Sequence, residues 1–221
     1  MQKHQQVIQE RKNREKDQRI QSILVAAKKV FFSKGYLKTT MDEIAFEAQI
    51  SKPTIYQYFN TKDELYSSLM QPFLEDFGKQ FERIDRKLSG RKYVSGKDLV
   101  KDLFKIFLRS YEKAPDSLKV AHTFFQHQDL INELNADTRS AISSRGKYDF
   151  ELARRVIASA IDQGLIRDVD SFALSDILWG LFVGITQVMD MKATKHEQAH
   201  RYLKSTLSLA EKLITDAIAL K

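Results

Sequence analysis

The sequence predicts an all-α protein. Prolines and glycines are scarce, at three and eight among 221 residues, whereas Lys, Glu, Gln, Ala and Leu, which favour helices, are plentiful. Apolar residues recur at helical spacing along most of the chain, and the alternating β-branched runs typical of strands are hard to find. We therefore expect about nine helices, divided between a small N-terminal domain and a larger C-terminal domain.

The composition also excludes several classes of protein. The chain has no cysteine, which excludes disulfides and thiol catalysis and fits a reducing cytoplasm. Residues 1–20 are polar and charged, so they do not form a secretory signal. The longest apolar stretch, 177–188, is too short to span a bilayer and is flanked by Asp176 and Asp190. We expect a cytoplasmic protein with no membrane partner.

Positive charge is concentrated near the N-terminus. Residues 1–62 carry 12 Lys and Arg against 6 Asp and Glu, whereas the other 159 residues carry 24 against 23. Such a basic segment favours a nucleic-acid partner, because phosphate contacts and counterion release dominate nucleic-acid affinity. A solvated basic face is the alternative. A membrane-surface role fits less well, since the segment's apolar residues are needed for its own core.

Residues 19–66 have the caps and breaks of a helix-turn-helix unit. A helix with apolar residues at every third or fourth position ends at Gly35, a typical left-handed C-cap. Thr40 and Glu43 form a capping box that begins a short second helix. Pro53 is tolerated in a first helical turn, so a third helix begins just before it. Two short helices joined by a three-residue break predict a helix-turn-helix.

The third of these helices has more polar side chains than its own packing requires. Only Ile55 and Phe59 are obvious core anchors. The remaining side chains point outward and are Lys52, Thr54, Tyr56, Gln57 and Tyr58. A helix of this kind fits the major groove, where polar side chains meet base edges. An ordinary solvated face of a three-helix subdomain is the alternative, and the basic charge favours DNA.

Two runs of residues resemble the TetR family of bacterial transcriptional regulators. They are Phe31-x3-Gly35-Tyr36-x2-Thr39-Thr40-x3-Ile44-Ala45 and Ser51-x2-Thr54-Ile55-Tyr56-x-Tyr58-Phe59-x2-Lys62-x2-Leu65. The resemblance implies that Pro53, Thr54 and Tyr56 face the bases, and that Gln57, Tyr58, Lys62 and Thr40 contact phosphates. Lys52 and Pro53 lie at positions where members of the family differ. The resemblance therefore makes them candidates for determining which operator sequence the protein binds.

The flanking segments complete the predicted domain organisation. Residues 1–18 form a basic tail rich in Gln, Lys and Arg, whose composition favours disorder; an extension of the first helix or a basic arm along DNA are the alternatives. Residues 67–221 form a helical effector-binding and dimerisation domain. Its first segment continues the fourth helix to about Leu88, with a kink expected at Pro72.

The C-terminal domain contains candidate residues for a ligand pocket. Pockets are mostly apolar with a few oriented polar groups. Side chains of this kind are Phe104, Phe107, Tyr111, His122, Phe125, Gln126, Tyr148, Trp179 and Phe182. Aromatic side chains at helical spacing also form ordinary core, which is the alternative for each of them. The small-molecule effector is unknown, and the aromatic content favours an apolar or aromatic one.

The last two predicted helices are candidates for a homodimer interface. Two mid-helix glycines cost about 1 kcal/mol each relative to alanine, and glycines four residues apart permit close helix approach. In the TetR family the final two helices pack against their mates. The candidate interface residues are Gly180, Gly184, Leu203, Leu207, Ala210 and Ile214. A monomeric bundle core is the alternative. A dimer would bring two recognition helices to half-sites one DNA turn apart.

His196-Glu197-x-x-His200 matches the zinc-protease pattern, in which two histidines share a helix face beside a general base. Catalysis also requires a third ligand, and Glu211 and Asp216 lie in what is predicted to be a packed terminal helix. We therefore expect no metal site, no catalytic residue, no cofactor and no enzymatic activity. A zinc hydrolase is the remote alternative.

The resemblance implies a repressor that binds a palindromic double-stranded DNA operator as a homodimer and is released by a small-molecule ligand. The main alternative is a DNA-binding protein of the same fold that acts as an activator or architectural factor without such a ligand. DNA binding that a ligand relieves would separate the two.

Overall fold

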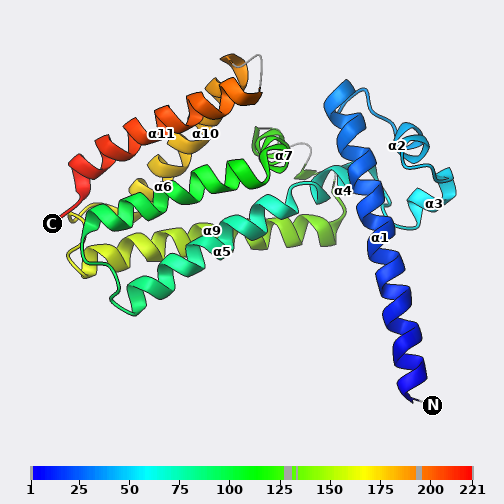
Figure 1. Ribbon diagram of the computed structural model, residues 1–221, viewed down its shortest axis with the longest axis horizontal. Coiled ribbons are helices and arrows are strands. Elements are labelled where there is room, and N and C mark those ends of the chain that lie inside the picture. The colour runs from blue at the N-terminus through cyan, green and yellow to red at the C-terminus, as the bar shows by residue number, and fades with distance from the viewer. Residues whose placement is uncertain (1, 127–130, 133, 193–195, 221) are drawn as a thin grey trace. The chain divides into compact units, whose positions relative to one another are not determined.

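The computed structural model describes residues 2–126, 131–132, 134–192 and 196–220, and over these residues the chain is helical, without a strand ladder (Figure 1). The helices are α1 (Gln2–Lys34), α2 (Met41–Glu47), α3 (Lys52–Tyr56), α4 (Lys62–Ser68), α5 (Gln71–Ser89), α6 (Gly96–Lys113), α7 (Pro115–Gln126), α9 (Ala136–Asp162), α10 (Ser171–Lys192) and α11 (His196–Ile218). The predicted all-α class is confirmed.

The chain divides into two compact units. The first contains residues 1–71 and 119–139, and the second contains residues 72–118 and 140–221. Helices α1 to α4 therefore lie in the first unit, and α5, α6, α10 and α11 lie in the second, whereas α7 and α9 each contribute to both.

The core of the first unit is built around α1, which packs against α2 and α4. Ile23, Ile44 and Leu65, one from each of these helices, are completely buried. The chain leaves α1 at Gly35, whose φ of 79° is the left-handed conformation expected of a C-cap. The ring of Tyr66 packs 4.8 Å from those of both Phe31 and Tyr36. This cluster holds the end of α1 against α4.

The N-terminal tail adopts the helical alternative rather than the expected disorder. Helix α1 begins at Gln2 and runs without a break to Lys34. No proline or glycine interrupts this stretch, and Gln, Lys, Arg and Glu favour helix. Side-chain pairs one turn apart add local support, as between Arg11 and Glu15 at 2.8 Å. Composition therefore did not distinguish disorder from helix in this segment. The same polar residues lower its hydrophobicity, which favours disorder, and have a high helix propensity.

The segment from Lys62 to Leu88 is interrupted, not merely kinked. Helix α4 ends at Ser68 and α5 begins at Gln71. Pro72 has no amide hydrogen to donate to the carbonyl four residues earlier, and its ring clashes with that carbonyl, which belongs to Ser68. The proline is tolerated in the first turn of α5, so the interruption falls just before it.

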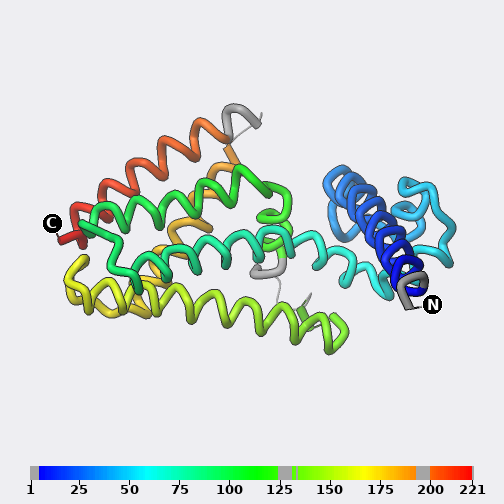
Figure 2. The backbone as a smooth tube through the Cα atoms, turned by 60° about the horizontal axis from the view of Figure 1, so that its bottom comes forward, coloured from blue at the N-terminus to red at the C-terminus, as the bar shows by residue number. Residues whose placement is uncertain are grey.

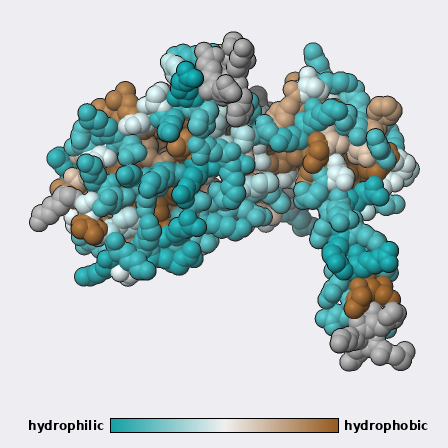
Figure 3. Space-filling model, viewed as in Figure 1, coloured by the Kyte–Doolittle hydropathy of each residue, from teal (hydrophilic) through white to brown (hydrophobic). Residues whose placement is uncertain are grey.

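The second unit packs α11 against α6 and α10, and polar contacts join α5 to α9 alongside it (Figures 1 and 2). The amide of Gly96 donates to the carbonyl of Leu220 at 3.1 Å, and the amide of Leu220 donates to the carbonyl of Leu165 at 2.8 Å. A Cβ at position 96 would lie 1.8 Å from the Leu165 carbonyl oxygen, so this approach requires glycine. Over α5 and α6 the surface in Figure 3 is mainly hydrophilic.

Candidate nucleic-acid interface

The turn between α2 and α3 positions a short, firmly capped third helix. Gln49 adopts a left-handed φ of 55°, which turns the chain after α2. Ser51 is the N-cap of α3, and its hydroxyl accepts a hydrogen bond from the Thr54 amide at 3.3 Å. Pro53 lies in the first turn, as predicted, and completely buried Ile55 anchors the helix to the core. The first helical turn therefore has little freedom to move.

The outer face of α3 is accessible. Lys52, Pro53, Tyr56 and Gln57 are exposed, whereas Thr54 and Tyr58 are partly exposed. Phe59 is buried, and its amide bonds back to the Ile55 carbonyl at 3.0 Å, so the helical turn continues past Tyr56. The structure thus separates the core anchors from the polar side chains in the way the sequence predicts. This face has the size and polarity that major-groove contacts require.

Lys52 is paired within the chain. Its Nζ lies 2.9 Å from the carboxylate of Asp42 on α2, and this hydrogen bond raises the pKa of Lys52. Both side chains are exposed, so the pair is weak and solvent competes for it. Sequence reasoning missed Asp42, because nothing in the spacing of ten residues indicates that these two side chains meet.

The predicted phosphate contacts Thr40 and Lys62 also have structural roles. The Thr40 hydroxyl accepts from the Glu43 amide at 3.3 Å, and the Glu43 carboxylate accepts from the Thr40 amide at 3.1 Å, which is the predicted capping box. Lys62 Nζ donates to the Tyr36 carbonyl at 3.1 Å and lies 4.3 Å from the centre of the Tyr36 ring. Lys62 is therefore held against the segment between α1 and α2. Thr40 remains exposed at the start of α2.

Two further ion pairs that the sequence did not reveal tie α1 to α2. Lys29 Nζ lies 2.6 Å from the Glu47 carboxylate, and Lys34 Nζ lies 2.5 Å from the Glu43 carboxylate. The Lys34 pair lowers the pKa of Glu43. These pairs hold α2 in place beside α1, and α2 in turn contacts α3.

Several of the predicted pocket residues fill the interior of the second unit with their own rings. Phe107 stacks on Phe182 at 4.6 Å between ring centres, and Phe104 and Trp179 flank this pair at 6.0 Å. Tyr111 is also buried. Helical spacing alone does not indicate whether these side chains surround a space or fill it. In this structure they pack as core.

The other predicted pocket residues lie elsewhere or outside the described side chains. His122 is buried in the first unit, and burial lowers its pKa to about 4, so it is neutral near pH 7. Tyr148 is 42% exposed on α9, and its hydroxyl donates to Glu82 at 3.3 Å. The side chains of Phe125 and Gln126 lie outside the described residues.

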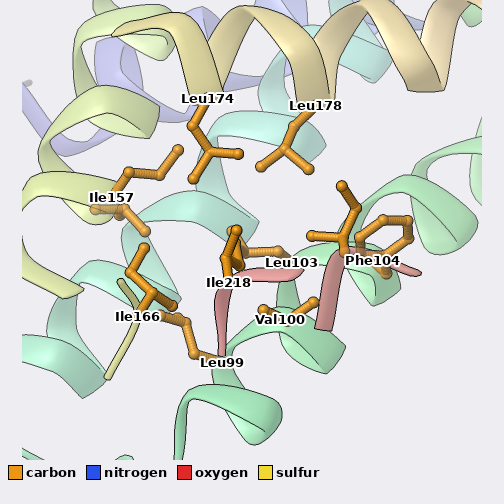
Figure 4. A pocket seen from close by; sticks show the side chains of 11 residues that line it. Leu99, Val100, Leu103, Phe104, Ile157, Ile166, Leu174, Leu178 and Ile218 are labelled. Atoms are coloured by element: carbon orange, nitrogen blue, oxygen red, sulfur yellow. The ribbon is translucent and has the colours of Figure 1, made fainter. Parts of the chain in front are cut away.

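A small apolar cavity lies in the second unit beside the aromatic cluster (Figure 4). Its volume is about 10 Å³, enough for about one water molecule. Aliphatic side chains from α6, α9, α10 and α11 line it, including Leu103, Ile157, Leu178 and Ile218. Phe104 is its one aromatic contributor and belongs to the predicted pocket set. An effector much larger than water requires this region to open.

The candidate dimer residues on α11 need correction. Leu203, Leu207 and Ala210 are 0%, 4% and 8% exposed, so they are core residues of the chain's own second unit and are inaccessible to a partner. Ile214 is partly exposed and lines the apolar cavity. Helix α11 is apolar on two faces, and the helical repeat alone does not show which of them faces inward.

The opposite faces of α10 and α11 leave large apolar side chains exposed. They are Ile177, Val188 and Met191 on α10, and Tyr202, Leu209 and Leu213 on α11. Gly180 and Gly184 belong to the accessible side of α10, since a Cβ at either position would meet no atom within 4 Å. This surface, which we call the α10–α11 face, consists of these eight residues.

Of the zinc-protease pattern, only the His200 side chain belongs to the described residues, which contain no group of three potential metal ligands. His200 Nε2 lies 2.8 Å from the Glu112 carboxylate of α6. The side chains of His196 and Glu197 lie outside the described residues.

Comparison with known proteins agrees with this geometry. Residues 23–69 match the family model described as "Bacterial regulatory proteins, tetR family". The transcriptional activator FasR of Mycolicibacterium smegmatis is 43% identical over 61 residues, but these cover only 28% of either chain. The transcriptional repressor KstR2 of Rhodococcus jostii is 28% identical over 152 residues, covering 67% of this chain and 68% of KstR2.

Solved structures share the fold at low sequence identity. The TetR-family regulator PfmR of Thermus thermophilus has a TM-score of 0.63 at 20% identity, covering 84% of this chain and 97% of PfmR. AibR, crystallised with isovaleryl coenzyme A and operator DNA, has a TM-score of 0.62 at 19% identity, covering 86% of this chain and 97% of AibR. The likeness extends through both units.

Proposed function

We propose that this chain, whose residues 23–69 match the TetR family model, is a cytoplasmic transcriptional repressor of that family that binds a palindromic operator as a homodimer and is released by a small-molecule ligand. The observation that carries the proposal is the exposed polar face of α3. That face belongs to a helix held by its Ser51 cap and Ile55 anchor, within the basic N-terminal segment.

DNA recognition is assigned to the residues predicted from the sequence. Tyr56 and Thr54 face the bases together with Pro53, and Gln57 and Tyr58 contact phosphates beside them. Lys52 exchanges its weak pairing with Asp42 for a phosphate or base contact, at little energetic cost because both side chains are exposed. Thr40 and Lys62 contribute from the starts of α2 and α4.

We assign dimerisation to the α10–α11 face. Exposed apolar side chains such as Ile177 and Leu213, which are 56% and 61% accessible, gain stability when a second copy covers them. The two outward glycines allow the backbone of α10 to approach the partner closely. Helix α10 is also long and apolar enough to cross a membrane by composition alone. Phe182 and Met189, on its inward face, are buried in this unit.

The ligand is assigned to the apolar interior between α6, α9, α10 and α11. AibR binds isovaleryl coenzyme A, which makes acyl thioesters the first class of effector to test here. Because the cavity holds little more than one water molecule, ligand binding must select a more open form of the second unit. That change of conformation is what couples the ligand to DNA release.

DNA binding by α3 is tested with Tyr56→Ala. Tyr56 is 41% exposed, and Tyr148, in the second unit, is 42% exposed, so Tyr148→Ala removes a ring of the same accessibility and serves as the control. We expect Tyr56→Ala to weaken binding to DNA from upstream of the protein's own gene by about fivefold to a hundredfold, a contact worth ~1–3 kcal/mol. The measurement is fluorescence anisotropy at fixed salt. Equal affinities for Tyr56→Ala and the wild type would refute the assignment of α3.

An activator is the second candidate, because FasR is an activator and matches the DNA-binding segment at 43% identity. A reporter gene behind the bound DNA separates the two functions. Deleting the regulator raises expression if it represses and lowers expression if it activates. The zinc hydrolase has no supporting observation beyond the sequence pattern.

A further inference from the structure

A charged groove lies between α5 and α6 in the second unit. Two adjoining clefts of about 330 Å³ and 280 Å³ form it, and they share Lys87, Asp102 and Lys105. Six cationic side chains line the two clefts together: Arg83, Lys87, Lys92, Lys101, Lys105 and Arg109. Only two carboxylates accompany them.

This concentration of charge is local. Residues 63–221 are almost balanced, with 24 Lys and Arg against 23 Asp and Glu. Without the residues of the groove, the same stretch has 18 basic and 21 acidic residues. The groove therefore has a net charge of +4, whereas the rest of this stretch has a net charge of −3, and a concave surface strengthens the field that an anion meets there.

Asp102 orders the side chains at the centre of the groove. Its carboxylate accepts hydrogen bonds from Lys87 Nζ at 2.6 Å, from the Tyr93 hydroxyl at 3.0 Å and from Lys105 Nζ at 3.2 Å. Each ammonium group has three donors, so pairing with Asp102 leaves others directed elsewhere. The two lysines are thus held side by side, which reduces the conformational entropy that a ligand must remove.

Arg83 on α5 and Arg109 on α6 add guanidinium groups to the larger cleft. Both are exposed, and within the described part of the chain neither forms an ion pair with a carboxylate. A guanidinium group presents paired N–H donors that match two oxygens of one phosphate. Ile84 and Ile106 provide apolar lining beside them, against which an organic group can pack.

We propose that this groove is a binding site for a small molecule carrying two or more phosphate groups. Six cations spread over two clefts exceed what one phosphate can engage, and the clefts are in the size range of small-molecule sites. The groove shares no lining residue with the apolar cavity, so the proposal does not depend on the effector or on DNA binding.

The test is isothermal titration calorimetry of the full chain with inorganic tripolyphosphate, compared with orthophosphate. We expect saturable binding of one tripolyphosphate per chain, and at least tenfold weaker binding of orthophosphate. The variant Arg83→Gln/Arg109→Gln should bind tripolyphosphate about tenfold more weakly, since two charge-assisted contacts are lost. Both positions are exposed, so the thermal unfolding midpoint should not change.

Lys147→Gln/Lys204→Gln is the matched control, because it removes two exposed cations of the second unit outside the groove. It should change tripolyphosphate affinity less than twofold. Equal losses in the two double variants would mean non-specific attraction and would overturn the proposal, as would an absence of saturable binding. Binding of the operator DNA should stay within twofold in both. If the groove variant instead lost DNA affinity while tripolyphosphate failed to bind, the groove would be a DNA surface and the proposal wrong.

Discussion

The helix-turn-helix segment of the first unit and the α5–α9 pair of the second unit depend on contacts that act over different sequence distances. In the first unit the caps that set the helix boundaries join residues three positions apart, as between Ser51 and Thr54. In the second unit α5 and α9 are joined by Tyr148 to Glu82 and by Arg155 to Asp85, which are 66 and 70 residues apart. Local signals therefore predict the first unit well, whereas the second depends on which helix faces meet.

The sharpest test of this difference uses the two faces of α11. Leu203→Ala should lower the free energy of unfolding by ~2–5 kcal/mol, because it leaves a cavity in a fully buried site. Leu213→Ala, on the exposed face, should change it far less when both variants are compared at the same protein concentration. Urea denaturation measures both free energies of unfolding.

Sedimentation equilibrium completes this test, because Leu213→Ala should weaken the proposed dimer. If the stability losses of the two variants were similar, the assignment of the inward and outward faces would be wrong.

A smaller effect is expected from His122 in the first unit. Burial lowers its pKa from 6.5 to about 4, so the unfolded chain binds the proton more readily than the folded chain. The free energy of unfolding is therefore unaffected by His122 above pH 6.5 and falls as the pH drops from there toward 4. The expected loss is about 2 kcal/mol between pH 7 and pH 5. Urea denaturation at both pH values measures the loss. His122→Gln should remove most of this difference, and an unchanged slope in that variant would show that another group is responsible.

The smallest expected effect concerns the Thr40 cap, a short-range interaction of the kind that could be predicted from the sequence. Thr40→Ala removes the hydroxyl of the capping box and should destabilise the first unit by about 1 kcal/mol. Thr40→Ser keeps the hydroxyl and should restore most of that stability. Thermal unfolding followed by circular dichroism provides the comparison. If both substitutions had the same effect, the methyl group of Thr40, not its cap, would be the stabilising feature.

The parts of the candidate site that depend on interactions within a few residues could be predicted from the sequence. The Thr40 and Ser51 caps both accept hydrogen bonds from amides three residues later. Ile55 and Phe59 are buried, and their polar neighbours remain accessible, as the helical repeat indicates. The pairing of Lys52 with Asp42 and the contact of Lys62 with Tyr36 could not be predicted, because they join different elements.

Taken by itself, the amino-acid sequence determined the all-α class, the helix boundaries at Gly35, Thr40 and just before Pro53, and the outward residues of α3. These depend on propensity, capping and periodicity within a few residues. Only the tertiary structure decided that Leu203 faces inward and Leu213 outward, and that Phe107 and Phe182 stack as core. It also brought the cations of α5 and α6 into one groove. Burial and charge clustering depend on packing between distant segments, which a one-dimensional pattern does not specify.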